Sequence, residues 1–534
     1  MESIILALSH DKAIAFDGLS DVMFKKELAK LTSSKLKDIW SINLDEVAGL
    51  KKSWVLRLIP LNKVFPETPT RTQLRPIVIS SPLIKLLEAR FLEKLKIYLN
   101  EKLDRSQTGF VDKMGIQVNL HRALKQITNR FKNGNSCFGL FIDFSNAYNS
   151  VPHTLLFQKL RQKQIFTEEE VQFLEALYAR YRIKIGKKYI RSNKGVAQGS
   201  IISPALFNIF IEDLSDQLKE EAGISLEDLL FYADDLLTLC DTQEQLAKCI
   251  QVIEKWSKDN GMLLNKKKSA IVIFSSRRKR KIPDLGEQLL GIPIIKQYKY
   301  LGTILDSKLT LGPQMKHIKK KVGHLFVQLY PYLKTATADA RRDMWQTMTA
   351  PLFNATLALH HFEPSKYGKE NIRRLWRMTF KRFLMISHRN STVLVDELMN
   401  RDITTITTKN ARIAEHKWKY RKGDIDYEQI YEQDPDKQEE NTLQKLNPIK
   451  GVPNNFCTLL KTQVRVCPKH PQKITSSWHM KYYHGCYIKP VSQIWQDDIK
   501  PLVDPNLRRD QIAASLTDLI DRYINIHNNY LSSL

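Results

Sequence analysis

Two adjacent carboxylates, Asp234 and Asp235, interrupt an apolar stretch at residues 229–240 (Leu-Leu-Phe-Tyr-Ala-Asp-Asp-Leu-Leu-Thr-Leu-Cys). The apolar runs on both sides are the right length for buried strands, so the stretch predicts a β-hairpin whose tight turn carries both acids. Successive strand side chains point to opposite faces, so we expect Asp234 to face a site and Asp235 to stand behind it or turn with the hairpin. Such charge is costly at the tip of an apolar hairpin unless a cation or a set of donors receives it. An ordinary surface turn is the alternative, because Asp is a common turn residue.

A second predicted strand ends on a matching acid. Residues 139–144 (Gly-Leu-Phe-Ile-Asp-Phe) are apolar apart from Asp143. Acids delivered from the ends of neighbouring strands can hold two divalent cations about 3.5–4 Å apart, which supports in-line phosphoryl transfer. Mg²⁺ suits this role because it takes few carboxylates and leaves its other positions to water and substrate phosphates. Asp143 and Asp234 are therefore the predicted metal-binding pair.

The residues around these acids resemble the motifs of a known family. Phe-Tyr-Ala-Asp-Asp at 231–235 resembles the active-site box of reverse transcriptases, and residues 143–148 resemble the box with the other metal-binding aspartate. Three further boxes stand in the expected order, at residues 194–204, 261–269 and 298–302. The last box, Tyr-Lys-Tyr-Leu-Gly, most resembles enzymes of non-LTR (LINE-type) retrotransposons, with group II intron enzymes as the nearest relatives.

The resemblance implies a role for each acid. Asp143 and Asp234 would hold two Mg²⁺ ions, which Mn²⁺ can replace, with Phe144 in the same metal-binding set. Asp235 would support them. Lys268 resembles the lysine that protonates the leaving pyrophosphate, but two lysines precede it directly. The choice among the three lysines, and a solvated role for all of them, stay open.

The resemblance also implies a nucleotide-binding set. Lys63 and Arg75 lie on two predicted strands, 54–63 and 74–79, and their charges suit a triphosphate, although solvated strand ends fit as well. Tyr148 would close the sugar pocket, because a ring under C2′ leaves no room for a ribose hydroxyl. The other implied members of the set are Phe144, Ser145, Gln198 and Gly199.

The composition indicates a polyanionic partner. The chain of 534 residues carries 83 Lys and Arg against 57 Asp and Glu, a formal net charge of +26. A merely soluble basic protein is the alternative. The six cysteines are irregularly spaced, which argues against a disulfide framework and favours a reducing compartment. No uncharged run suits a membrane span, and the first residues lack the features of a signal or transit peptide.

Two stretches leave more than one interpretation open. The run at 266–281 is rich in Lys and Arg and has no acid, so it fits contact with a nucleic-acid backbone, nuclear import or a solvated loop. The C-terminal region contains scattered cysteines and histidines whose spacing matches no compact zinc site. We interpret them as part of a small basic domain, with a zinc site as the alternative. These residues are Cys457, Cys467, His470, His479, His484 and Cys486.

The predicted fold class is α+β, a right-hand polymerase with an antiparallel palm sheet, a helical thumb and a basic C-terminal region. The predicted boundaries are fingers 1–132, palm 133–305 (with a fingers/palm segment 155–200), thumb 306–400, connector 401–454 and C-terminal region 455–534. The predicted function is RNA-directed DNA polymerisation on a primer 3′-hydroxyl. An RNA-binding maturase or a host-recruited structural RNA-binding protein is the alternative.

The expected partners are an RNA template, a DNA primer or duplex and deoxynucleoside triphosphates, with no membrane. Residues 12–19 (Lys-Ala-Ile-Ala-Phe-Asp-Gly-Leu) resemble the box that precedes the fingers in LINE-type enzymes, so we expect any endonuclease to be supplied by another chain. The expected location is the nucleus, or otherwise the cytoplasm.

Overall fold

The computed structural model describes residues 14–15, 17–18, 52–62, 67–70, 73–185, 187–276, 286–385, 395, 403–426, 464–467 and 470–476. The chain divides into two compact units. The first comprises Met1–Leu301, Asp306–Lys308 and Lys417–Asp424, and the second comprises Gly302–Leu305, Leu309–His416 and Ile425–Leu534.

A four-stranded antiparallel sheet in the order β6-β7-β3-β8 forms the centre of the first unit. Its strands are β3 (Cys137–Ile142), β6 (Leu229–Tyr232), β7 (Asp235–Cys240) and β8 (Ala270–Phe274). Every residue of β3 is buried. Gly139 lets the neighbouring strand approach, since a Cβ there would lie 2.5 Å from the Phe274 ring. Such close packing fixes the register that places Ile142 opposite Leu236.

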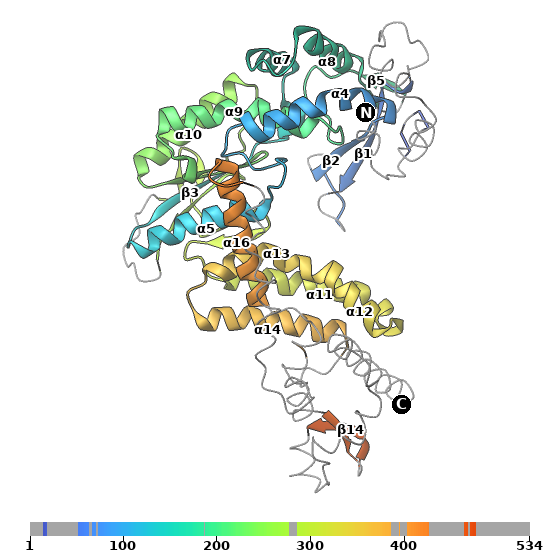
Figure 1. Cartoon of the computed structure of the whole chain (residues 1–534), viewed down its shortest axis with the longest axis vertical. Coiled ribbons are helices and arrows are strands. Elements are labelled where there is room, and N and C mark those ends of the chain that lie inside the picture. The colour runs from blue at the N-terminus through green and yellow to red at the C-terminus, as the bar shows by residue number, and fades with distance from the viewer. Residues whose placement is uncertain are drawn as a thin grey trace. The chain divides into compact units, whose positions relative to one another are not determined.

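Helices cover this sheet (Figure 1). α9 (Ser203–Ala222) packs against α10 (Gln243–Asp259), which also contacts β3 and β7, and α5 (Ile116–Lys132) contacts β6. α10 begins where the Thr242 hydroxyl accepts a hydrogen bond from the backbone of Gln245, and α9 ends at Gly223 in a left-handed conformation. Apolar side chains of both layers form one core, which includes Leu140, Ile142, Phe207, Phe210, Leu236, Ile253 and Trp256.

A second four-stranded sheet has the order β2-β1-β4-β5. Its strands are β1 (Val55–Asn62), β2 (Leu74–Ile79), β4 (Arg182–Ile185) and β5 (Lys188–Ile190). β1 and β2 form the antiparallel pair that the sequence predicts. α4 (Pro82–Ile97) follows, and Ser81 caps its start, because the Ser81 hydroxyl accepts from the backbone of Leu83 at 3.2 Å.

Shorter elements complete the first unit. They are η3 (Tyr98–Lys102), α6 (Ala147–Ser150), α7 (His153–Gln162), α8 (Glu168–Arg180), η4 (Leu226–Asp228), β9 (Gln288–Leu289), β10 (Ile292–Pro293) and β11 (Gln297–Tyr300). β12 (Thr303–Asp306) lies at the boundary of the two units.

The second unit is mainly helical where it is described. Its elements are α11 (Gly312–Thr335), α12 (Ala338–Met344), η5 (Trp345–Thr349), α13 (Ala350–Phe362), α14 (Lys366–Phe383), most of α16 (Ile403–Lys422), β13 (Val464–Cys467) and β14 (His470–Ser476). Trp345 and Trp376 meet edge to face at 4.6 Å in its core. Helices are therefore present in the region 306–400 that the sequence predicts to be helical.

Several predicted features lie outside the described residues. These are Lys63, the basic cluster 277–281, most of the predicted connector, and Cys457, His479, His484 and Cys486. Cys467 and His470 are partners in the β13–β14 hairpin. The basic run at 266–281 is not one loop, because residues 270–274 form the buried strand β8. No helix among the described residues is long and apolar enough to cross a membrane.

Candidate active site

The β6–β7 hairpin carries the two predicted acids, but its turn differs from the prediction. Tyr232 pairs with Asp235, so Ala233 and Asp234 form the turn and Asp235 opens β7. Ala233 has φ +55°, the left-handed conformation that tight hairpin turns require. Sequence patterning missed this because alanine rarely adopts that conformation. Asp234 is half-buried and Asp235 is exposed.

Asp143 follows β3 directly, and its main chain is held on both sides. Its amide donates to the Ser269 hydroxyl at 3.1 Å, and its carbonyl accepts from the Asn265 amide at 2.9 Å. Because β3 pairs with β7 up to Ile142 and Leu236, Asp143 comes next to the start of β7. The two predicted strand ends therefore meet, and Asn265 and Ser269 fix the first of them.

The three carboxylates act on one another electrostatically. Although Asp235 as a residue is exposed to solvent, the protein atoms around its carboxyl group desolvate it and raise its pKa to about 6, helped by the charges of Asp234 and Asp143. Burial also raises the pKa of Asp234, as does Asp143, while the charge of Arg75 acts in the opposite direction. Like charges held this close raise the cost of ionisation, which a bound cation would remove.

Few side chains in this site could bind a metal ion. Among the described residues, no group of three or more His, Cys, Asp or Glu side chains is arranged to hold a metal ion. Mg²⁺ does not need such a group, because it commonly binds one or two carboxylates and completes its coordination with water and substrate phosphates. The Phe144 side chain is buried against Trp256, so this residue has only its main chain to offer.

Tyr148 and Gln198 share a second part of the site. The Tyr148 ring stacks on Phe207 with 4.6 Å between centroids, and its carbonyl accepts from the Val196 amide at 2.7 Å. The Tyr148 hydroxyl and Gln198 Oε1 are buried and have no hydrogen-bond partner among the described residues. Burial, followed by the charge of Asp234, raises the pKa of Tyr148. Buried polar atoms usually have a hydrogen-bond partner, which for these two atoms is not found among the described residues.

Gly199 joins the Gln198 turn to β2. It has φ +131°, and a Cβ there would lie 2.0 Å from the Val78 carbonyl oxygen. The Val78 amide donates to the Gln198 carbonyl at 2.7 Å, which fixes the turn beside the strand that carries Arg75. Only glycine fits at this contact.

Two other residues predicted for the site are Ser145 and Lys268. Ser145 donates from its amide to the Leu263 carbonyl at 2.8 Å. Lys268 is exposed in the turn before β8. Lys266, one of the two other lysines considered for the same role, forms an ion pair with Glu254 and donates to the Leu290 carbonyl at 3.0 Å. Lys267 is exposed.

Sequence reasoning missed the residues that hold the hairpin from behind. The Gln107 side chain accepts from the Ala233 amide at 2.9 Å and donates to the Ala233 carbonyl at 3.2 Å. Asn119 donates to the Phe231 carbonyl at 2.8 Å. The Gln-Thr-Gly-Phe sequence at 107–110 was the available signal, but nothing in it indicates a contact with residue 233.

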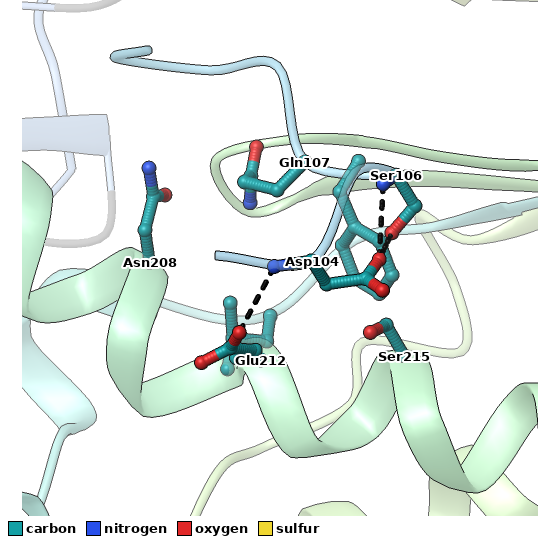
Figure 2. Close-up of a pocket in the computed structure, with 8 residues that line it drawn as sticks. Asp104, Ser106, Gln107, Asn208, Glu212 and Ser215 are labelled. Atoms are coloured by element: carbon teal, nitrogen blue, oxygen red, sulfur yellow. Dashed lines mark hydrogen bonds between the residues drawn. The ribbon is translucent and has the colours of Figure 1, made fainter. Parts of the chain in front are cut away.

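Figure 2 shows the region behind the hairpin, where Asp104, Ser106 and Gln107 lie opposite residues of α9. The Glu212 carboxylate accepts from the Asp104 amide at 2.9 Å. A cavity of about 10 Å³ remains among these side chains, and the acids of the hairpin tip do not line it.

Comparisons with known proteins agree with this geometry. Residues 63–305 match the family described as reverse transcriptase (RNA-dependent DNA polymerase). A probable RNA-directed DNA polymerase from transposon BS of Drosophila melanogaster is 26% identical over 323 residues, which are 57% of this chain and 35% of that protein. The RNA-directed DNA polymerase from mobile element jockey of the same species is 25% identical over 52% of this chain and 31% of its own length.

A Pol polyprotein from the type-1 retrotransposable element R2 of Nasonia vitripennis is 27% identical, covering 45% of this chain and 25% of its own length. The matched regions thus span about a third or less of these curated relatives. The structure of apo telomerase from Candida Tropicalis, truncated from its C-terminal domain, has a TM-score of 0.35 and 13% identity over 53% of this chain and 59% of that one. That likeness is too weak to support a conclusion. Residues 63–305 thus match the reverse transcriptase family, and the relatives that this chain resembles come from non-LTR retrotransposons such as jockey and R2.

Proposed function

We propose that this chain is an RNA-directed DNA polymerase that adds deoxynucleotides to a primer 3′-hydroxyl. The observation that carries the proposal is the meeting of Asp143 with Asp234 and Asp235 on paired strands, within a segment that matches reverse transcriptases. The primer 3′-oxygen attacks the α-phosphorus, a new P–O bond forms, and the bond to the leaving pyrophosphate breaks. The hydroxyl proton passes to solvent or to a nearby base.

Asp143 and Asp234 would hold two Mg²⁺ ions, with Asp235 in support, and Mn²⁺ can replace them. When bound, the ions stabilise the attacking and leaving oxygens and the charge on the phosphate. Burial, and after it the charges of neighbouring acids, raise the pKa values of Asp234 and Asp235, and cations bound there would favour the ionised carboxylates. The rest of catalysis is positioning of the primer end against the triphosphate.

The nucleotide would lie between the Tyr148–Gln198 part of the site and β2. Arg75 is exposed on β2, and its charge acts on Asp234, so it is placed to meet a triphosphate. The Tyr148 ring would exclude a 2′-hydroxyl by contact. Gln198 Oε1 and the Tyr148 hydroxyl would find their missing polar partners on the nucleotide or on ordered water.

The proposal also covers the nucleic-acid partners, the location in the cell and the roles of further residues. An RNA template and a DNA primer fit the net charge of +26, and so does a location in the nucleus. Lys63 would add to the triphosphate site and Lys268 would protonate pyrophosphate. Zinc is the alternative for the C-terminal cysteines and histidines.

Primer extension on a defined RNA template with Mg²⁺ tests the proposal. We expect the purified chain to extend a DNA primer and the Asp143→Ala variant to lose extension while it still binds RNA. Asp259→Ala is the matched control, because Asp259 is exposed at the end of α10. Wild-type extension by Asp143→Ala, or no extension by the wild type with any divalent ion, would overturn the assignment.

The sugar contact has its own test. Tyr148→Val should raise incorporation of ribonucleotides relative to matched deoxynucleotides, measured as a competition ratio. An unchanged ratio would remove Tyr148 from the sugar pocket.

A further inference from the structure

A short segment far beyond the matched domain belongs to the first unit. Residues Lys417–Asp424, at the end of α16, are part of the unit that contains the candidate active site, although the family match ends at residue 305. Arg421 in this segment is only 2% exposed. A buried arginine is costly unless its donors are used, so its partners are informative.

The Arg421 guanidinium donates five hydrogen bonds to main-chain carbonyls. Nη1 lies 2.9 Å from the Leu99 oxygen and 3.0 Å from that of Asn100. Nη2 lies 3.1–3.3 Å from the carbonyl oxygens of Leu103, Asp104 and Gln107.

Two of these carbonyls, those of Leu99 and Asn100, lie in the last turn before the helix ends, and the other three lie in the loop that follows. α4 continues into η3, which stops at Lys102, and the last carbonyls of a helix have no partner within it. The negative end of the helix dipole also favours a cation at this place. The planar guanidinium can reach several carbonyls at once, whereas the ammonium of lysine is a point charge on a flexible stem. Arg421 therefore organises the loop from residue 99 to residue 107.

That loop is joined directly to the catalytic hairpin. The carbonyl of its last residue, Gln107, accepts from Arg421. The side-chain amide of Gln107 accepts from the Ala233 amide and donates to the Ala233 carbonyl. The Phe231 amide donates to the Ser106 carbonyl at 3.1 Å. Gly109 allows this approach, because a Cβ there would lie 2.3 Å from the Ala233 nitrogen. Two steps thus connect Arg421 to the residue before Asp234.

One turn earlier on the same helix face, Trp418 acts on the other end of β6. Its ring centroid lies 3.5 Å from the Arg122 guanidinium, and its Nε1 donates to Glu227 at 3.0 Å. Arg122 in turn donates to the Leu229 carbonyl at 3.0 Å. β6 is therefore supported at its start through Trp418 and at its end through Arg421.

We propose that residues 417–424 are a structural part of the active site, in which Arg421 and Trp418 are positioning residues that set the hairpin carrying Asp234 and Asp235. This inference rests on the proposed polymerase function for its activity readout, and on geometry alone for the order of the hairpin. Neither residue touches the reacting atoms.

The test compares Arg421→Met with Lys419→Met in the full chain. Lys419 lies on the same helix and is exposed, so its variant removes one charge without touching the loop. Amide hydrogen exchange reports on residues 98–109 and 229–237, and steady-state extension reports kcat, the KM for deoxynucleotide and the Kd for primer–template. For Arg421→Met we expect faster exchange in both segments and a kcat lower by about 10- to 100-fold, with Kd within about twofold of wild type. Lys419→Met should match wild type.

A second variant tests whether the effect of Arg421 reaches Ala233 through Gln107. It remains informative even if Arg421→Met does not fold. Gln107→Leu removes the contacts to Ala233 while the Gln107 carbonyl remains for Arg421. It should loosen residues 229–237 but leave residues 98–104 protected. Hairpin exchange in Arg421→Met or Gln107→Leu equal to that of Lys419→Met would overturn the proposal, as would a kcat loss matched by an equal loss of primer–template binding. If the wild type does not extend primers, the proposed function fails, while the exchange measurements still decide this inference.

Discussion

The two sides of the β6–β7 hairpin differ in how their acidic residues are stabilised. We call the side with Asp143, Asp234 and Asp235 the front, and the side with Asp104 and Gln107 the back. At the front, burial raises the pKa of Asp235 to about 6, and the nearby charges are those of other acids. At the back, burial alone would raise the pKa of Asp104, but hydrogen bonds from Lys219 and Ser106 outweigh it and hold that pKa below its usual value. The difference separates the chemistry from its support. At the back, cations of the chain stabilise an acid within the fold, whereas the acids at the front raise one another's pKa, and we propose that they are held for cations from outside.

The largest effect that would test this contrast comes from neutralising an acid at the front. Asp234→Asn should lower extension by about 10³-fold, because it removes a charge on which catalysis depends. It should leave the thermal midpoint, measured in metal-free buffer, unchanged or higher, because Asp143 and Asp235 lose a like charge. A clear drop in the midpoint would mean that the front acids also hold the fold.

Removing a charge at the back should act on stability instead. Arg122→Met leaves the Leu229 carbonyl and the Asn119 side chain without their donor, and should lower the free energy of unfolding by about 3 kcal/mol. Urea unfolding followed by circular dichroism measures this loss. Lys102→Met, at an exposed position, should stay within about 0.5 kcal/mol of wild type. Equal midpoints for the two variants would remove the distinction between front and back.

Glu88 is intermediate between the acids at the front and those at the back. It is buried, and the groups that donate hydrogen bonds to it are mainly neutral. It lies on α4 and accepts from the Tyr181 hydroxyl at 2.9 Å and from the Ile201 amide at 3.2 Å, just after the Gln198–Gly199 turn. Burial raises its pKa from 4.5 to about 7. The folded state therefore keeps a proton that the unfolded state releases, so stability should fall as pH rises from about 4.5 to 7.

Glu88→Gln should remove that pH dependence. The wild type should lose up to about 3 kcal/mol of stability across this range relative to the variant. Thermal midpoints at pH 5, 6, 7 and 8 give the comparison. Parallel pH profiles for the two proteins would show that Glu88 is already ionised in the fold.

The smallest effect concerns an unpartnered atom at the front. The Tyr148 hydroxyl is buried without a hydrogen-bond partner among the described residues. Tyr148→Phe should therefore change the free energy of unfolding by less than about 1 kcal/mol, and in the stabilising direction. Denaturant titration without nucleotide measures this. Destabilisation by more than that would place a protein partner on the hydroxyl.

The sequence predicted the front of the site better than the back. Strand pairing, the helix cap at Ser81 and the two acidic strand ends follow from periodicity and local chemistry, which a sequence displays directly. The left-handed Ala233 was missed because its conformation is imposed by Gln107, 126 residues away. Arg421 was missed because its five partners are main-chain carbonyls, which have no residue type and leave no pattern.

The contact between Arg421 and Leu99 spans 322 positions in the chain, and this separation matters during synthesis. After Asp235 has been added to the growing chain, Arg421 is the 186th residue that the ribosome adds. At about 5–20 residues per second, that interval is roughly 10–40 s. Throughout it, the nascent protein has its catalytic acids but lacks the helix end that holds them in place. We expect this centre to mature only after the segment Lys417–Asp424 has been made.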